Sequence, residues 1–266
     1  RALGFNNIFG GVGIGLGALS AGILIDQYSW HAAFILPGII SLLIGIGLAW
    51  HIQSNQISLK NIVSGKFNEN PERSQYLKIA IIMLISITCL SFVFQILQTS
   101  LPKTIDIRLS TNMDLSTSEI GYIVSAIYVV SGLMNYVGGI LADKFSEKII
   151  YAIGIIGQGC LLLLIISLSN YWLIAICLMI VAFNSSILPA ENLLLARFAP
   201  EKYQSLVYGI KFIISFSVGP IALILISKSY ELTNEFSYLY LASGVIMLLL
   251  FMVVLTLPVK KQALAT

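Results

Sequence analysis

The chain has 266 residues, of which 58% are hydrophobic and 10% are charged, and its mean hydropathy is +0.92. Soluble domains are about 45–50% apolar and about 25% charged, so this composition excludes a water-soluble globule and a disordered chain. The formal net charge of +3 does not indicate nucleic-acid binding, because the lysines and arginines lie in short loops and form no tract.

Eight blocks of mostly apolar residues follow one another along the chain. The hydrocarbon core of a bilayer, about 30 Å thick, needs about 20 such residues per helix. The blocks lack the period-2 alternation of a barrel strand, so we predict α-helices. They cover residues 2–25, 32–50, 79–100, 120–142, 149–168, 172–194, 206–227 and 237–258. The predicted fold class is an all-α polytopic membrane protein with eight transmembrane helices.

The first two blocks precede a long polar stretch. The chain starts at Arg1 and enters an apolar segment at once, so we expect that an upstream part is missing. The first block is rich in glycine, and Gly11 and Gly15 form a small-xxx-small pair that favours close helix packing. The polar residues 51–78 predict a linker between two helical units.

The distribution of cations predicts the topology. If Arg1 faces the cytoplasm, the inner side holds eleven lysines and arginines: Arg1, Lys60, Lys66, Arg73, Lys78, Lys144, Lys148, Arg197, Lys202, Lys260 and Lys261. The outer side then holds three, which are Lys103, Arg108 and Lys228. This positive-inside bias places both ends of the chain in the cytoplasm. The outer loop predicted at 101–119 ends in Ser116-Thr-Ser-Glu119, a capping box that starts the fourth helix.

Polar residues inside the blocks recur at helical spacing, and inside a membrane such residues face protein or water. They line one face of each of four blocks: Thr88, Ser91, Gln95 and Gln98; Tyr122, Ser125, Tyr128, Gly132 and Asn135; Asn184, Glu191 and the neighbouring Asn192; and Lys211, Ser215 and Gly219. The second, fifth and eighth blocks carry almost no polar side chain, so we predict that they are peripheral and that the others surround a cavity. For any single polar residue the alternative is an interhelical hydrogen bond worth about 1 kcal/mol.

Glu191 and Lys211 are charged residues within otherwise apolar helices. Glu191 lies six residues before Arg197, and Lys211 lies at a similar distance from the start of its block, so both sit about 9 Å inside the cytoplasmic edge. We expect them to pair, because either charge alone would cost several kcal/mol of desolvation. Glu191 would then accept a proton or act as a gate for the transport path. Lys211 would attract an anionic part of the substrate or change its ion-pair partner during the transport cycle. The alternative is a static structural ion pair. Pro189 either kinks the sixth helix as a gate or is simply tolerated there.

We expect no enzyme activity, no catalytic residue, no cofactor and no metal site. An intramembrane protease or zinc enzyme needs paired acids or a His-Glu motif within the spans, yet Glu191 is the one embedded acid, and His31 and His51 lie at block ends. The three cysteines lie inside apolar blocks, where they act as packing residues. The glycine-rich first block does not predict a dinucleotide loop, because no strand precedes it.

An internal repeat and two motifs indicate a family. The first block aligns with the seventh at an offset of 205 and the second with the eighth at 206, and six-helix repeats build several transporter families. The segment Gly139-Ile-Leu-Ala-Asp143-Lys144-Phe-Ser-Glu-Lys148 resembles the loop motif of the major facilitator superfamily (MFS), with Ser146 and Glu147 in place of the usual glycine and cation. Its entry Glu119-Ile-Gly121 looks like the same family, and Trp30-His31-Ala-Ala-Phe34 is similar to the family's Trp-Arg-x-x-Phe.

The resemblance implies an MFS-type helical bundle in which the eight blocks are helices five to twelve of twelve. Residues 1–50 would end the N-terminal half, 51–78 would be the cytoplasmic central linker, 79–258 would form the C-terminal six-helix half, and 259–266 would be a cytoplasmic tail. In the family the two halves lock together on the cytoplasmic side. Here Asp143 would accept hydrogen bonds from the start of the first helix, beside Arg1; the alternative is a solvated loop acid that sets topology.

The function implied is secondary active transport of a small solute by alternating access, in a bacterial inner membrane, with proton coupling through Glu191. Residues 184–200 are weakly similar to efflux permeases of the fosmidomycin-resistance type, whereas uptake of a small organic anion fits Lys211 equally well. A non-transporting receptor or assembly subunit is the alternative from another class. The expected partners are the lipid bilayer, a small-molecule substrate and protons, and we expect a monomer. The candidate substrate and coupling residues are Glu191, Lys211, Asn184, Asn192, Gln95, Gln98, Tyr128 and Asn135, and the gating residues are Gly139, Asp143, Lys144, Lys148 and Pro189.

Overall fold

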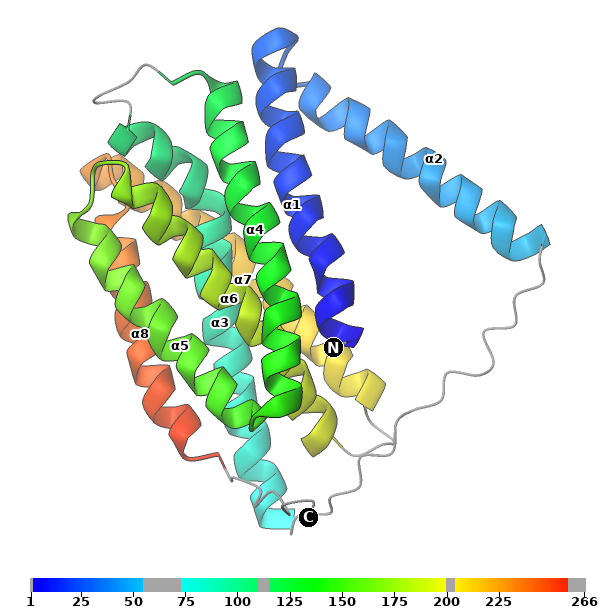
Figure 1. Ribbon diagram of the computed structural model, residues 1–266, viewed down its shortest axis with the longest axis vertical. Helices are drawn as coiled ribbons and strands as arrows, with labels where there is room; N and C mark the ends of the chain where they lie inside the picture. Colours follow the sequence, from blue (N-terminus) through cyan, green and yellow to red (C-terminus); the bar gives the residue numbers. More distant parts are fainter. Residues whose placement is uncertain (1, 55–72, 110–114, 200–203, 258–266) are drawn as a thin grey trace.

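The computed structural model describes residues 2–54, 73–109, 115–199 and 204–257. These residues form eight α-helices and one short 3-10 helix (Figure 1). Their bounds are α1 (Ala2–Gln27), α2 (Ala32–Ser54), α3 (Arg73–Leu109), α4 (Thr117–Lys144), α5 (Glu147–Leu164), η1 (Ile165–Ser167), α6 (Trp172–Phe198), α7 (Gln204–Thr233) and α8 (Ser237–Leu255). All eight α-helices are long and apolar enough to cross a membrane, which confirms the predicted fold class.

Several helices extend beyond the apolar blocks. The outer loop predicted at 101–119 is wrong for residues 101–109, because α3 continues as a helix to Leu109. In this last segment Thr104 bonds to Tyr240 on α8 and Arg108 bonds to the carbonyl of Ile165 in η1, and these contacts stabilise the helix beyond the end of the apolar block. Within the predicted linker 51–78, residues 51–54 continue α2 and residues 73–78 belong to α3, and residues 55–72 lie outside the described residues.

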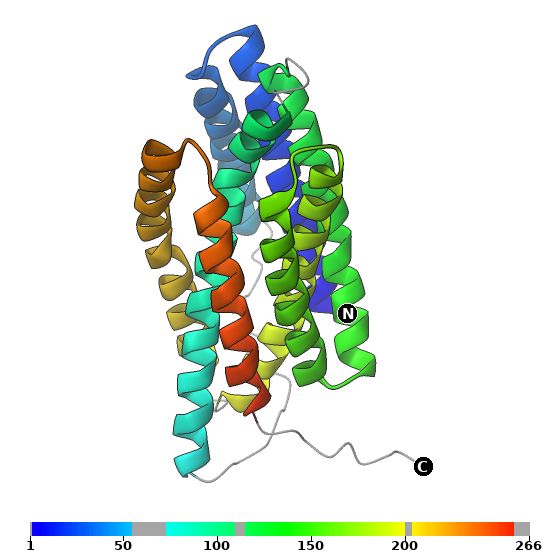
Figure 2. The ribbon, with the colours of Figure 1, turned by 90° about the vertical axis from the view of Figure 1, so that its left-hand side faces the viewer.

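The helices alternate in direction, so both ends of the described chain lie at the same end of the bundle (Figures 1 and 2). α1 packs along α4, α4 along α6, α5 between α6 and α8, and α3 against α7. Among the described elements α2 contacts α1 alone, none of its described residues is buried, and it leans away from the bundle (Figure 1). The core of the bundle therefore lies around α3 to α6, and α2 contributes no residue to it.

Glycines explain the close approach of α1 to α4. A Cβ at Gly15 would lie 2.9 Å from the carbonyl oxygen of Ser125, and a Cβ at Gly11 would collide with the backbone of Gly132. At Gly10 and Gly13, on the other side of α1, a Cβ would meet no described atom within 4 Å. The small-xxx-small pair predicted from the sequence is thus confirmed as a helix contact.

The start of α4 is fixed by the predicted capping box. The Ser116 hydroxyl accepts a hydrogen bond from the Glu119 N–H at 3.2 Å, and the Glu119 carboxylate accepts one from the Ser116 N–H at 2.8 Å. Asp26, near the end of α1, accepts a hydrogen bond from the Ser118 N–H at 2.6 Å. These bonds satisfy backbone donors that a helix N-terminus leaves free, and they tie α1 to α4.

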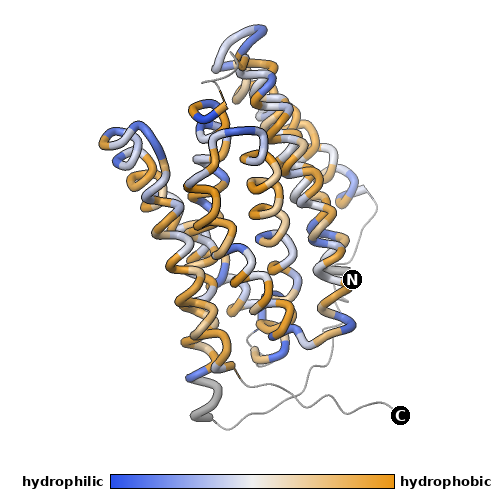
Figure 3. The backbone as a smooth tube through the Cα atoms, turned by 60° about the vertical axis from the view of Figure 1, so that its left-hand side comes forward, coloured by the Kyte–Doolittle hydropathy of each residue, from blue (hydrophilic) through white to orange (hydrophobic). Residues whose placement is uncertain are grey.

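Hydropathy follows the bundle axis. Apolar residues cover the middle of the helices and hydrophilic residues gather near the ends and turns (Figure 3). Four described cations, Lys78, Lys144, Lys148 and Arg197, lie at the end of the bundle where α1 begins. Lys103, Arg108 and Lys228 lie toward the opposite end. The remaining cations of the predicted inner set, apart from Arg73 at the start of α3, lie outside the described residues.

Candidate substrate and coupling site

A buried ion pair joins α6 to α7. Glu191 Oε1 lies 2.5 Å from Lys211 Nζ, and the two side chains are 3% and 8% exposed. Lys211 Nζ also donates a hydrogen bond to the side-chain oxygen of Asn192 at 2.6 Å. The pairing expected from equal depth in the membrane is therefore present, and each charge offsets the cost of burying the other.

Two further helices support this pair. The Tyr151 hydroxyl on α5 lies 3.4 Å from Glu191 Oε2, to which it donates, and it shares a 2.5 Å hydrogen bond with the Ser86 hydroxyl on α3. Tyr208 on α7 donates to the backbone carbonyl of Asn192 at 2.9 Å. Glu191 is the one acid that is buried among the described residues.

Sequence reasoning missed Tyr151 and Ser86. The fifth block was predicted to be peripheral, yet Tyr151 is fully buried on the inner face of α5. Ser86 lies off the polar face that was predicted for the third block. The available signal was the tyrosine itself, because a phenol in an apolar helix needs a hydrogen-bond partner when it is buried.

A cavity of about 770 Å³ lies beside Lys211. Its walls come from the first turns of the apolar part of α3, the last turns of α6 and the first part of α7, and Lys211 is its one charged lining residue among the described residues. All other lining residues are aliphatic or aromatic, among them Ile87, Leu195 and Ile214. The Glu191–Lys211 ion pair thus borders an apolar cavity through Lys211.

The polar faces predicted on α3 and α7 face each other. The hydroxyls of Ser91 and Ser215 are 2.7 Å apart, and a Cβ at Gly219 would lie 3.1 Å from the amide nitrogen of Gln95. These contacts are interhelical, which was the alternative reading for single polar residues. Gln98 is half-buried one turn further along α3.

The remaining candidate residues are Tyr128 and Asn135 on α4 and Asn184, two turns before Glu191 on α6. Tyr128, Asn135 and Asn184 are all buried, and among the described residues the Tyr128 hydroxyl and the Asn135 side-chain oxygen have no hydrogen-bond partner. Asn184 is seven residues from Glu191, or about 10 Å along the helix. Among the described residues, no hydrogen bond or ion pair joins these three residues to Lys211.

The motif residues at the end of α4 divide into two groups. Asp143 and Lys144 are exposed, and a Cβ at Gly4 of α1 would lie 3.3 Å from the Cα of Gly139, so the start of α1 lies beside this end of α4. Arg1, the expected neighbour of Asp143, lies outside the described residues. Lys148 instead donates to the backbone carbonyls of Leu255, at 2.6 Å, and Leu257, where it stabilises the C-terminal end of α8.

The two remaining features of this end of the bundle are Glu147 and Pro189. Glu147, which replaces the cation of the family motif, forms a two-point ion pair with Arg197 at 2.7 and 2.8 Å and so joins α5 to the end of α6. This pair gives a physical reason for the departure from the motif. Pro189 is buried inside α6, which is assigned as helical on both sides of it.

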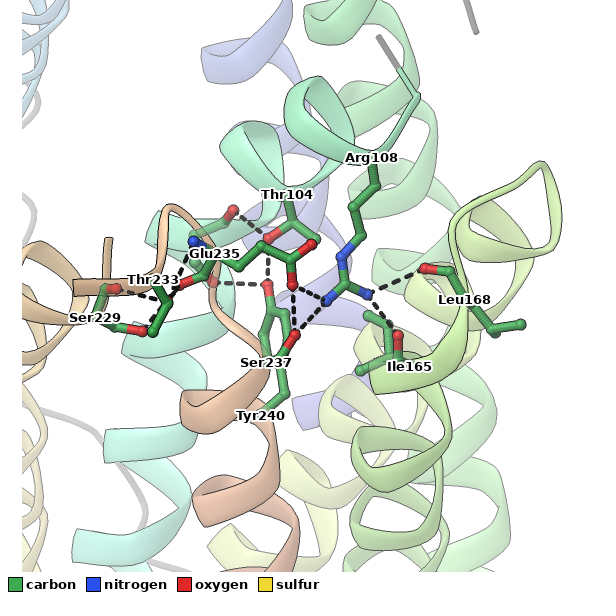
Figure 4. A network of polar contacts seen from close by, with 10 residues as sticks. Thr104, Arg108, Ile165, Leu168, Ser229, Thr233, Glu235, Ser237 and Tyr240 are labelled. Carbon is green, nitrogen blue, oxygen red and sulfur yellow. Dashed lines mark hydrogen bonds and ion pairs between the residues drawn. The ribbon is translucent and has the colours of Figure 1, made fainter. Parts of the chain in front are cut away.

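A second buried network lies at the other end of the bundle (Figure 4). Arg108, which falls within the predicted outer loop 101–119, is 5% exposed and donates to the backbone carbonyls of Ile165 at 2.6 Å and Leu168 at 3.1 Å. It also donates to Glu235 at 3.2 Å and to the Ser237 hydroxyl at 3.0 Å. These bonds join the end of α3 to the turn before α6 and the turn before α8. The spacing of polar residues in the sequence does not predict these hydrogen bonds.

Comparison with known families agrees with this architecture. Residues 1–110 and 80–265 match the family model described as Major Facilitator Superfamily, so the two matched stretches together cover nearly the whole chain. A comparison with curated proteins gave no match. The apolar helices, their alternating directions and this match agree: the chain is a multi-pass membrane protein that belongs to the major facilitator superfamily of transporters.

Proposed function

We propose that this chain contributes helices five to twelve of a twelve-helix carrier. In this assignment α1 and α2 end the N-terminal half, residues 51–78 contain the cytoplasmic linker, and α3 to α8 form the C-terminal half. Two uncovered apolar faces support it. None of the described α2 residues is buried, and α7 exposes Phe212, Ile213 and Phe216. Helices from the rest of the carrier would cover both faces, and both termini of the chain would be cytoplasmic.

We further propose that the carrier is a proton-coupled secondary transporter that works by alternating access. The observation that carries this proposal is the buried Glu191–Lys211 pair. A carboxylate and an ammonium inside a membrane are costly and are usually retained for function. If Glu191 takes a proton, the pair loses its attraction and Lys211 becomes free to bind another anion. The cycle of pairing and release would then couple proton movement to the exchange of inward-facing and outward-facing states.

Two features of the sequence bear on the direction of transport and on the cell type. The similarity of residues 184–200 to efflux permeases favours export from a bacterial cell across the inner membrane, whereas Lys211 suits uptake of an organic anion as well. Inverted and right-side-out vesicles distinguish these directions, because a solute that is exported by cells accumulates in inverted vesicles. A carrier that moves no solute in either vesicle type would instead support a receptor or assembly role.

The coupling role is tested with the complete carrier in liposomes. A panel of solutes is offered with and without an imposed pH gradient, and proton flux is recorded with an internal pH dye. We expect a gradient-dependent solute flux that Glu191→Gln abolishes. Glu231→Gln is the matched control, because Glu231 is an exposed acid at the far end of α7, and it should retain coupled flux. Coupled transport that persists in Glu191→Gln would rule out this role of Glu191.

A further inference from the structure

We propose that the cavity beside Lys211 binds amphipathic organic monoanions, and that each anion binds together with one proton on Glu191. This inference rests on the proposed transport function and names the substrate class of the same site. It depends on three observations: the chemistry of the cavity wall, the unused hydrogen-bonding capacity of Lys211 and the charge balance of the ion pair.

The wall of the cavity selects the body of the ligand. The volume of about 770 Å³ is in the range of small-molecule sites, about 300–1,000 Å³. With all lining residues except Lys211 apolar, the cavity offers a polar or multiply charged solute almost no hydrogen bonds. A hydrocarbon chain or an aromatic ring gains free energy there by leaving water.

Lys211 selects the head of the ligand. An ammonium has three N–H donors. Two of them have acceptors, Glu191 Oε1 at 2.5 Å and the Asn192 side-chain oxygen at 2.6 Å, and no other described residue accepts from the third. Lys211 also lines the cavity, so a carboxylate whose hydrocarbon part fills the apolar space can reach this donor. A cationic head would be repelled by the same group.

The charge balance requires a proton. Glu191 and Lys211 together are neutral. Within the described part of the chain, the neighbouring titratable groups are the hydroxyls of Tyr151 on α5 and Tyr208 on α7 and the thiol of Cys89 on α3. A bound monoanion would leave one uncompensated negative charge in this apolar region, which is costly. A proton on the Glu191 carboxylate removes that charge, and the anion then takes its place on Lys211. Anion and proton therefore enter as an electroneutral pair.

The test measures binding and proton uptake together, with the complete carrier in detergent. Radiolabelled octanoate is the probe, and octanamide, octylammonium and acetate are competitors that change one property at a time. We expect octanoate to bind with uptake of about one proton from a weakly buffered solution. Octanamide and octylammonium should compete at least ten-fold more weakly because they lack the negative charge, and acetate because it lacks the apolar body.

Substitutions in the pair should act in opposite directions. Lys211→Met should weaken octanoate binding about a hundred-fold, as expected when one partner of a buried charge pair is removed. Glu191→Gln should tighten binding and abolish proton uptake, because Lys211 then carries an unpaired charge. The double variant Lys211→Met/Glu191→Gln keeps the site neutral, so it should fold and fail to bind octanoate even if Lys211→Met alone does not fold. Lys228→Met, which removes an exposed lysine toward the far end of α7 and outside the lining residues, should bind like the wild type.

In the binding assay, two results would overturn this inference. One is octanoate binding that is unaffected by the double variant, as expected if an acyl chain occupies the cavity without using the charge. The other is octanoate binding without proton uptake in the wild type. Failure of the transport function gives a different result. A pH gradient that drives only polar or cationic solutes would keep the coupling role and refute the substrate class, whereas octanoate binding with proton uptake but without flux would keep the substrate class and refute transport.

Discussion

The Arg108 network makes a sharp prediction about stability. Arg108→Met keeps most of the apolar stem of the side chain and removes the guanidinium, so packing along α3 is largely preserved. The variant then loses the hydrogen bonds to Ile165, Leu168, Glu235 and Ser237 (Figure 4).

The expected magnitude follows from the exposure of the partners. A hydrogen bond to a charged group contributes about 1.5–3 kcal/mol, and a buried acceptor left without a partner costs about 1–3 kcal/mol. The Ile165 carbonyl belongs to a buried residue, whereas Glu235 is 42% exposed and regains water. The two carbonyl contacts therefore dominate, and we expect the free energy of unfolding to fall by about 3–5 kcal/mol.

The assay is equilibrium unfolding of the complete carrier in mixed micelles with increasing SDS, followed by circular dichroism. Lys103→Met is the matched control: it removes a cation one turn earlier on α3, but this side chain is 48% exposed and pairs with Asp106 in the same helix. The control should lose about 0.5 kcal/mol. If Arg108→Met loses no more than this control, the network does not stabilise the bundle and the reasoning from buried contacts is refuted.

Three further predictions concern the packing and the cytoplasmic end. Gly11→Leu should separate α1 from α4 and lower the melting temperature of the carrier more than Gly13→Leu does, because no described atom lies within 4 Å of a Cβ at Gly13; equal shifts would contradict the close contact. Glu147→Arg and Arg197→Glu should each destabilise the carrier, and combining them should restore at least half of the loss in thermal unfolding; additive losses would argue against a direct pair. Asp143→Asn should shift the carrier toward states in which cysteine reagents reach the cavity from the cytoplasm, and an unchanged accessibility would favour a role of Asp143 in topology alone.

The candidate substrate and coupling residues show what residue spacing can predict. Depth along a helix is set by the rise per residue, so two lone charges at equal depth on consecutive helices could be expected to meet, and Glu191 and Lys211 do. Spacing also identified the polar faces of α3 and α7, but it could not say what each face contacts. The structure turns Ser91 and Gln95 toward α7, because two faces that each carry small or polar groups pack against one another.

The sequence alone determined the number of membrane helices, their alternating directions, the start of α4 and the glycine contact surface of α1, since hydropathy, charge bias and capping are local properties of the chain. Only the tertiary structure decided the partners that lie far away in sequence. Tyr151 and Ser86 support Glu191 across three helices. Arg108 stabilises the part of α3 beyond its apolar block, because backbone carbonyls at the turn before α6 accept its hydrogen bonds. Such contacts depend on how the helices are rotated and offset in the bundle, and those degrees of freedom are set by packing over the whole structure.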